Sequence, residues 1–66
     1  MTTDIWIREW DAPIQVVESV TVVTTRIREA VPRSGFIAVT SDGAGEPDTI
    51  ISVSSIQVVR KTPYGG

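Results

Sequence analysis

The feature that most restricts the fold of this chain is the absence of any residue that could cross-link a small domain. Its 66 residues include neither cysteine nor histidine, so disulfides and ordinary zinc sites are excluded. A chain of this length buries only about 60% of its unfolded surface, which leaves apolar material for one core. Because small domains without disulfides or bound metals are marginally stable, we expect self-association. We predict a single domain over residues 1–61, followed by a flexible tail over 62–66.

The same absence restricts chemistry. Catalysis near neutral pH usually draws on histidine or cysteine, so every histidine-based triad and every cysteine nucleophile is excluded. Glu9 and Asp11 could pair, and the loop acids Asp42, Glu46 and Asp48 offer oxygen ligands. The loop spacing does not match a calcium-binding loop, however, and solvated surface acids explain both groups better. We therefore predict no enzymatic activity, no metal and no cofactor.

A first strand is predicted over residues 4–10, DIWIREW, because apolar and other residues alternate there. Its two isoleucines share one face. The other face carries Trp6, Arg8 and Trp10. Two indoles beside a guanidinium form the kind of amphipathic surface that is enriched at binding hot spots, so these three residues are a candidate contact surface.

The segment 13–31 is compatible with two structures. Spacings of three and four would place one apolar stripe on a helix, formed by Val16, Val20, Val23, Ile27, Ala30 and Val31. Yet ten of the fourteen residues from 14 to 27 are Val, Ile or Thr, and their summed helix penalty is roughly 5 kcal/mol. The same residues favour a pleated surface. We predict one bent strand or two short strands over 14–29, and keep a helix over about 13–31 as the alternative.

The C-terminal half is predicted to form a hairpin followed by a last strand. Residues 35–40, GFIAVT, are apolar on both faces, which suits a central strand, and SDGAGEPD over 41–48 is a loop that joins it to an antiparallel partner. The apolar parity changes at Ser54-Ser55, which predicts a bulge or a 3₁₀ turn. The predicted fold is all-β, an SH3-like or related partly open barrel of about five strands. The alternative is α+β with one helix.

Charge narrows the range of partners. Eight acids against six bases give a net charge of −2, which disfavours a partner bound mainly through phosphates. A local cluster of bases, Arg26, Arg28 and Arg33, nevertheless leaves a small nucleic-acid-binding barrel as one alternative function. No apolar run is long enough for a membrane span, and the first residues lack the pattern of a signal peptide. Cytoplasmic synthesis is therefore expected.

The C-terminal residues suggest two further ideas. The final Gly65-Gly66 resembles the ends of ubiquitin-like carriers, so a carrier activated at this terminus is a second alternative, while Tyr64 could belong to an arm that packs on a neighbouring subunit. The run GFIAVT, SDGAGEPD and TIISVSSIQVV resembles the ends of short β-rich proteins of bacteriophages and bacteria. That resemblance implies an accessory or virion-associated protein. Our leading hypothesis is a structural or interaction module that binds itself or a larger protein.

Overall fold

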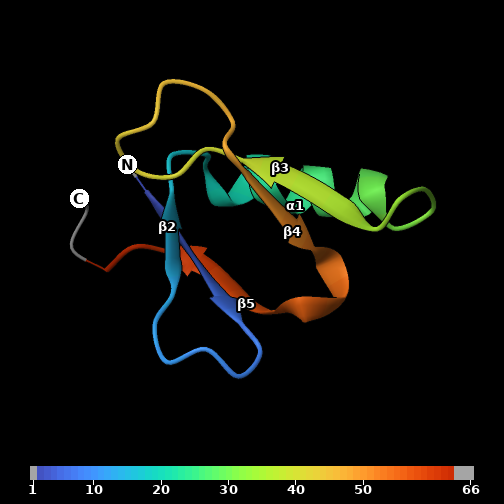
Figure 1. The fold of residues 1–66 in the computed structure, drawn as a ribbon, viewed down its shortest axis with the longest axis horizontal. Helices are drawn as coiled ribbons and strands as arrows, with labels where there is room; N and C mark the ends of the chain where they lie inside the picture. Colours follow the sequence, from blue (N-terminus) through green and yellow to red (C-terminus); the bar gives the residue numbers. More distant parts are fainter. Residues whose placement is uncertain (1, 64–66) are drawn as a thin grey trace.

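A computed structural model describes residues 2–63 as five short strands, one α-helix and one 3₁₀ turn (Figure 1). In chain order, the elements are β1 (Thr3–Ile7), β2 (Ile14–Val16), α1 (Val20–Ala30), β3 (Phe36–Val39), β4 (Thr49–Ser52), η1 (Val53–Ser55) and β5 (Ile56–Lys61). The domain is therefore β-rich, as predicted, but it contains the helix of the alternative prediction.

The strands form two sheets that meet at one point. One sheet has the order β2-β1-β5 and the other is the hairpin β3-β4, and every strand pair is antiparallel. A single β-bridge between Val16 and Ser41 connects the sheets, with the Val17 N–H donating to the Thr40 carbonyl at 2.9 Å beside it. Figure 1 shows β1, β2 and β5 on one side, and α1 beside the β3-β4 hairpin on the other.

The core lies between the two sheets and the helix. Its buried apolar members are Ile5, Ile7, Val16, Val23, Ala30, Ile37, Val39 and Ile51. The alternation predicted for the first strand is confirmed, because Ile5 and Ile7 are buried whereas Trp6 is only partly covered. Each fully buried isoleucine or valine contributes about 1.5–3 kcal/mol relative to an exposed one, so these few side chains supply most of the driving force for folding.

The predicted strand over 14–29 is wrong beyond Val16, because residues 20–30 form a helix. One local effect and one tertiary effect offset the low helix propensity of Val, Ile and Thr. The Ser19 hydroxyl caps the first turn by accepting from the Val22 N–H at 3.2 Å, and the helix buries Val23 and Ala30 against the sheets. After the helix, the N–H groups of Arg33 and Gly35 both donate to the Ala30 carbonyl at 2.9 Å, and the φ of +76° at Gly35 turns the chain into β3.

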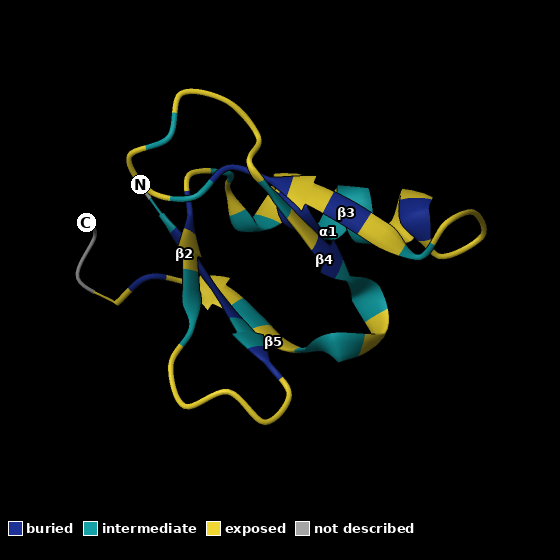
Figure 2. Cartoon of the chain, viewed as in Figure 1, coloured by how far each residue is buried: buried dark blue, intermediate teal, exposed yellow. Residues whose placement is uncertain are grey.

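Two strand predictions also need correction. The first strand ends at Ile7 rather than at Trp10, because Arg8 and Glu9 form a turn in which Glu9 takes a φ of +75°. The strand within 35–40 is not central: Ile37 and Val39 are buried, whereas Phe36 and Ala38 face outward. Figure 2 shows this alternation along β3. The strand lacks a second covering layer, which is why its apolar outer face stays exposed.

The 3₁₀ turn predicted near Ser54-Ser55, where the apolar positions change from one strand face to the other, is confirmed as η1. A bulge then shifts the register between β1 and β5, so that Trp6 lies opposite Val58 and Ile7 lies opposite Ile56. Ile56 packs on the core, while Val58 points outward. The loop over 41–48 and the antiparallel pairing of β3 with β4 are also as predicted.

The chain end of the described part is attached to β1. The Thr62 hydroxyl donates to Oδ1 of the buried Asp4 at 2.7 Å, and the Thr62 N–H donates to the Thr2 carbonyl at 3.1 Å. Thr62, which the sequence places in the predicted tail, is thus buried and held. The tail residues 64–66, including Tyr64 and the terminal glycine pair, lie outside the described residues.

Candidate interaction surface

Four large apolar side chains are more than half exposed in the described part of the chain. They are Val31 (64%), Phe36 (55%), Ile50 (68%) and Trp10 (58%). Val31 and Phe36 line one hollow, and Ile50 and Trp10 line another. Phe36 and Ile50 are diagonal neighbours on one face of the hairpin, because Phe36 pairs with Ser52 and Ala38 pairs with Ile50. The four therefore form one continuous chain of neighbours, which we call the apolar row.

The centre of the row is the outer face of the β3-β4 hairpin. Residues of equal parity in the paired strands share a face, so Phe36, Ala38, Ile50 and Ser52 lie together and point away from the core. Helix α1 borders this face on the β3 side, where a hollow of about 390 Å³ is rimmed by Arg26, Glu29 and Arg33 and floored by Phe36 and Ala38. The hairpin thus presents an apolar centre with a charged rim on one side, which is the usual anatomy of a contact surface.

The far end of the row is a hollow between the two sheets. It has a volume of about 260 Å³ and is bounded by Trp10 on one side and by β4 on the other. The described residues that line it carry no charge, and they are Ile7, Trp10, Ile14, Thr49, Ile50, Ile51, Ser52 and Ser55. The positive φ of Glu9 turns the chain after β1, and the Trp10 N–H then bonds the Ile7 carbonyl at 3.1 Å. This turn places the indole beside the hollow rather than in the strand.

The structure separates the predicted group of Trp6, Arg8 and Trp10. Trp6 lies opposite Val58 and lines a different hollow, with Gln57, Val58 and Arg60. Arg8 is exposed in the turn after β1, and its backbone N–H donates to the Ser55 carbonyl at 2.8 Å. The two indoles therefore belong to two different surfaces, and of the three residues only Trp10 belongs to the apolar row.

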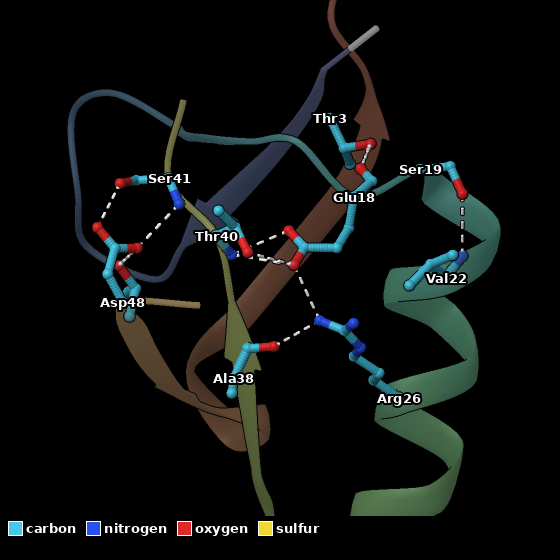
Figure 3. A network of polar contacts seen from close by, with 10 residues as sticks. Thr3, Glu18, Ser19, Val22, Arg26, Ala38, Thr40, Ser41 and Asp48 are labelled. Carbon is cyan, nitrogen blue, oxygen red and sulfur yellow. Dashed lines mark hydrogen bonds and ion pairs between the residues drawn. The ribbon is translucent and has the colours of Figure 1, made fainter. Parts of the chain in front are cut away.

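The three arginines are not brought together as one basic patch. Nη1 of Arg26 bonds Oε2 of Glu18 at 2.9 Å and the Ala38 carbonyl at 2.7 Å (Figure 3). Arg33 lies at the edge of the same hollow as Arg26, beside Glu29. Arg28 is exposed on α1 and is not part of that lining. One of the three cations is thus engaged within the fold, and another has an acidic neighbour.

Glu18 ties the start of the helix to the end of β3. Its side chain is only 8% exposed and its carboxylate accepts from the N–H and the hydroxyl of Thr40 at 2.9 Å, while its own carbonyl accepts from the Thr3 hydroxyl. Burial by itself would raise the pKa of Glu18, but the bonds from Thr40 and Arg26 outweigh it and lower the pKa below its ordinary value. The N–H and hydroxyl of Thr40 and the Arg26 guanidinium all bond this carboxylate, so it supports the fold by joining the helix to β3.

The acidic loop over residues 41–48 is also held by hydrogen bonds to a carboxylate. Asp48 accepts from the Ser41 hydroxyl at 2.6 Å and from the Ser41 N–H at 2.9 Å, and these bonds lower the pKa of Asp48. The two residues close the loop between β3 and β4 at its base (Figure 3). Over residues 2–63, no three acidic side chains gather in a way that could hold a metal ion.

Sequence reasoning missed three members of the row, namely Val31, Phe36 and Ile50. A weak signal was present, because the apolar outer positions of residues 35–40 could be either covered or exposed. The sequence analysis predicts that they are covered.

Comparisons with protein families, with curated proteins and with solved structures found no match. No helix within residues 2–63 is long and apolar enough to cross a membrane.

Proposed function

We propose that this chain is a non-enzymatic interaction module that associates with itself through the apolar row. The observation that carries the proposal is the arrangement of its exposed apolar side chains. Within residues 2–63, the four that are more than half exposed are neighbours, whereas those below that level, Val17, Val22 and Val58, lie outside the row. Single exposed apolar residues are ordinary, but a continuous group marks a contact surface.

A second consideration is the size of the core. Only eight apolar residues are buried in the described part, and neither a disulfide nor a histidine-based metal site can add stability. Small domains of this kind gain stability by oligomerisation, since binding to the folded form lowers its free energy by mass action. Covering the row would add apolar burial that the monomer lacks.

We further propose that the fold is a partly open, SH3-like barrel with a helix placed between β2 and β3. The bridge at Val16 and Ser41 that joins the two sheets supports this, as does the corner that η1 makes between β4 and β5. From the resemblance of the closing sequence pattern to short β-rich proteins of bacteriophages and bacteria, we also propose that this self-associating module acts within an accessory or virion-associated assembly.

The row is tested by sedimentation velocity with a double variant, Phe36→Ser with Ile50→Ser. We expect the variant to remain folded by circular dichroism and to need at least about tenfold higher concentration to associate, because truncated hot-spot contacts commonly cost more than 1 kcal/mol. The matched control is Val17→Ser with Val58→Ser, two side chains that are each 43% exposed and lie outside the row. Equal association of both double variants would contradict the proposal.

The two alternative functions stay predictions. Engagement of Arg26 by Glu18 weighs against the nucleic-acid-binding barrel. Titration with an oligonucleotide at low and high salt tests it, since phosphate contacts require a steep salt dependence. Deletion of Gly65 and Gly66 tests the carrier.

A further inference from the structure

The structure leaves one strand edge without the protection that the other edges have. The two sheets have four edges in total: β2 and β5 in one sheet, β3 and β4 in the other. The β2 edge bonds residues 40–42 through the bridge described above. The β3 edge receives the Arg26 guanidinium at the Ala38 carbonyl. The β5 edge carries exposed Arg60 and Lys61, and charged side chains on an edge oppose pairing with another strand.

The β4 edge has none of these devices. Its sequence, TIIS, contains no charge and no proline, and within residues 2–63 its one hydrogen-bonded neighbour is β3. Beside this edge lies the uncharged hollow bounded by Trp10. An uncharged edge next to an apolar hollow is suited to an added strand, whose backbone bonds the edge while its side chains enter the hollow.

The backbone groups that would make these bonds can be identified. The Val53 N–H donates to the Gly35 carbonyl at 2.8 Å, which sets the alternation along the hairpin so that Ile51 forms a hydrogen-bonded pair with Ile37. The N–H and C=O groups of Ile50 and Ser52 must then point away from β3. The Ser52 carbonyl also accepts the first bond of η1, of which Ser52 is the N-cap, so the groups left free at this edge are the N–H and C=O of Ile50 and the N–H of Ser52.

We propose that the added strand is β4 of a second copy of this chain, paired antiparallel about a twofold axis at Ile51. In this register Ile50 of one copy lies opposite Ser52 of the second copy, and the reverse pair forms by symmetry. The free N–H and C=O of Ile50 and the free N–H of Ser52 are then bonded in both copies, and each Ser52 carbonyl accepts a second bond beside the one from η1. The inference rests on the proposed self-association and places the contact at the Ile50 and Trp10 end of the apolar row.

Two observations favour a second copy over another partner. The four-residue edge is its own complement in length, in charge and in the spacing of its free positions. The exposed Trp10 and Ile50 lie beside the joined edges, so pairing covers the indole and the most exposed apolar side chain together.

The register is tested by disulfide formation, which the cysteine-free sequence makes unambiguous. Ile50→Cys and Ser52→Cys are prepared separately, mixed and oxidised. The proposed pair has Cα atoms about 5.5 Å apart, within disulfide range. Two copies of the same variant would place their cysteines about 8 Å apart, which is too far. We expect the mixed disulfide to form several-fold faster than either symmetric one.

The matched control uses the β5 edge. Val58→Cys is mixed with Arg60→Cys, because these two positions on β5 are two residues apart, as Ile50 and Ser52 are on β4. We expect no preferred cross-link there. Mixed and symmetric β4 disulfides at equal rates would overturn the pairing, and so would faster cross-linking on β5. Self-association measured on the unmodified chain is independent of this result, so a dimer without the β4 register would reject this geometry and leave the proposed function standing.

Trp10 gives a second readout that needs no cross-link. The variant Trp6→Phe leaves Trp10 as the sole indole. We expect its emission to shift to shorter wavelength as protein concentration rises, because the second copy covers it. The control Trp10→Phe should show no such shift from Trp6. A concentration-dependent shift confined to Trp6 would contradict the geometry.

Discussion

Arg26 and Glu18 are joined by a 2.9 Å ion pair that links the middle of α1 to the residue just before its N-cap. The same guanidinium nitrogen also reaches the carbonyl of Ala38 in β3. The pair thus connects the helix to the hairpin that carries the apolar row. Because the Glu18 side chain is nearly buried and that of Arg26 is 37% exposed, loss of either partner should cost free energy of unfolding by unequal amounts.

We expect Arg26→Ala to lower the free energy of unfolding by about 1–2 kcal/mol, because Glu18 then keeps only the bonds from Thr40. Glu18→Ala should cost more, about 2–3 kcal/mol, since the N–H and hydroxyl of Thr40 lose their acceptor. Urea unfolding measures both. The control Arg28→Ala, at an exposed site on the same helix, should change stability by less than about 0.5 kcal/mol. Equal effects of the two arginine variants would refute the role of the ion pair.

The lowered pKa of Glu18 predicts acid sensitivity. The unfolded chain titrates this carboxyl near its ordinary value of 4.5, and the folded chain titrates it below that value. Between these two values the unfolded state binds more protons, so stability is present above about pH 4.5 and is lost as the pH falls through the folded pKa. Urea unfolding between pH 7 and pH 3 should show a shallower acid loss for Glu18→Gln than for the unmodified chain. Parallel profiles would rule out this contribution.

Thr62 should matter more for stability than its place near the C-terminus suggests. We expect Thr62→Val to cost about 1–2 kcal/mol, because the buried Asp4 then loses the hydroxyl donor at 2.7 Å. Valine keeps the shape and β-branching of threonine, so the change removes only the hydroxyl, with its bond to Asp4 and the bond that it accepts from the Thr2 hydroxyl at 2.7 Å. Thr25→Val on the exposed face of α1 is the control, and should stay within about 0.5 kcal/mol. If both variants unfold at the same denaturant concentration, Thr62 does not anchor β5 to β1.

The sequence predicts those parts of the fold that depend on local patterns. Ile5 and Ile7 alternate with Trp6, the change of parity at Ser54-Ser55 marks the 3₁₀ turn, and the loop over 41–48 is rich in turn residues. Each of these features follows from backbone geometry within a few residues. They need no information about distant parts of the chain.

The helix could not be predicted with the same security, because its stability depends on tertiary contacts. Val23 and Ala30 become buried only when both sheets are in place, and Glu18 finds Thr40 at 22 residues' distance along the chain. Propensity alone favours a strand there. In the same way, the turn at Glu9 has no glycine to mark its positive φ, so the departure of Trp10 from the strand is not visible in the sequence.

The contact surface was only partly predictable. Trp10 is a candidate from its residue type alone, but Phe36 and Ile50 become neighbours through the hairpin register, and Val31 joins them through the hollow that it shares with Phe36. Exposure of an apolar strand face depends on what packs over it. Here nothing in the described part covers the outer face of the hairpin, and the interaction surface follows from that.

The most direct test of self-association is sedimentation equilibrium of the unmodified chain over a wide range of protein concentration. We predict that the weight-average mass rises from the mass of one chain toward twice that mass as concentration increases, with the α1 and strand signals in circular dichroism unchanged. A mass that stays at one chain at every concentration up to the millimolar range would contradict the account.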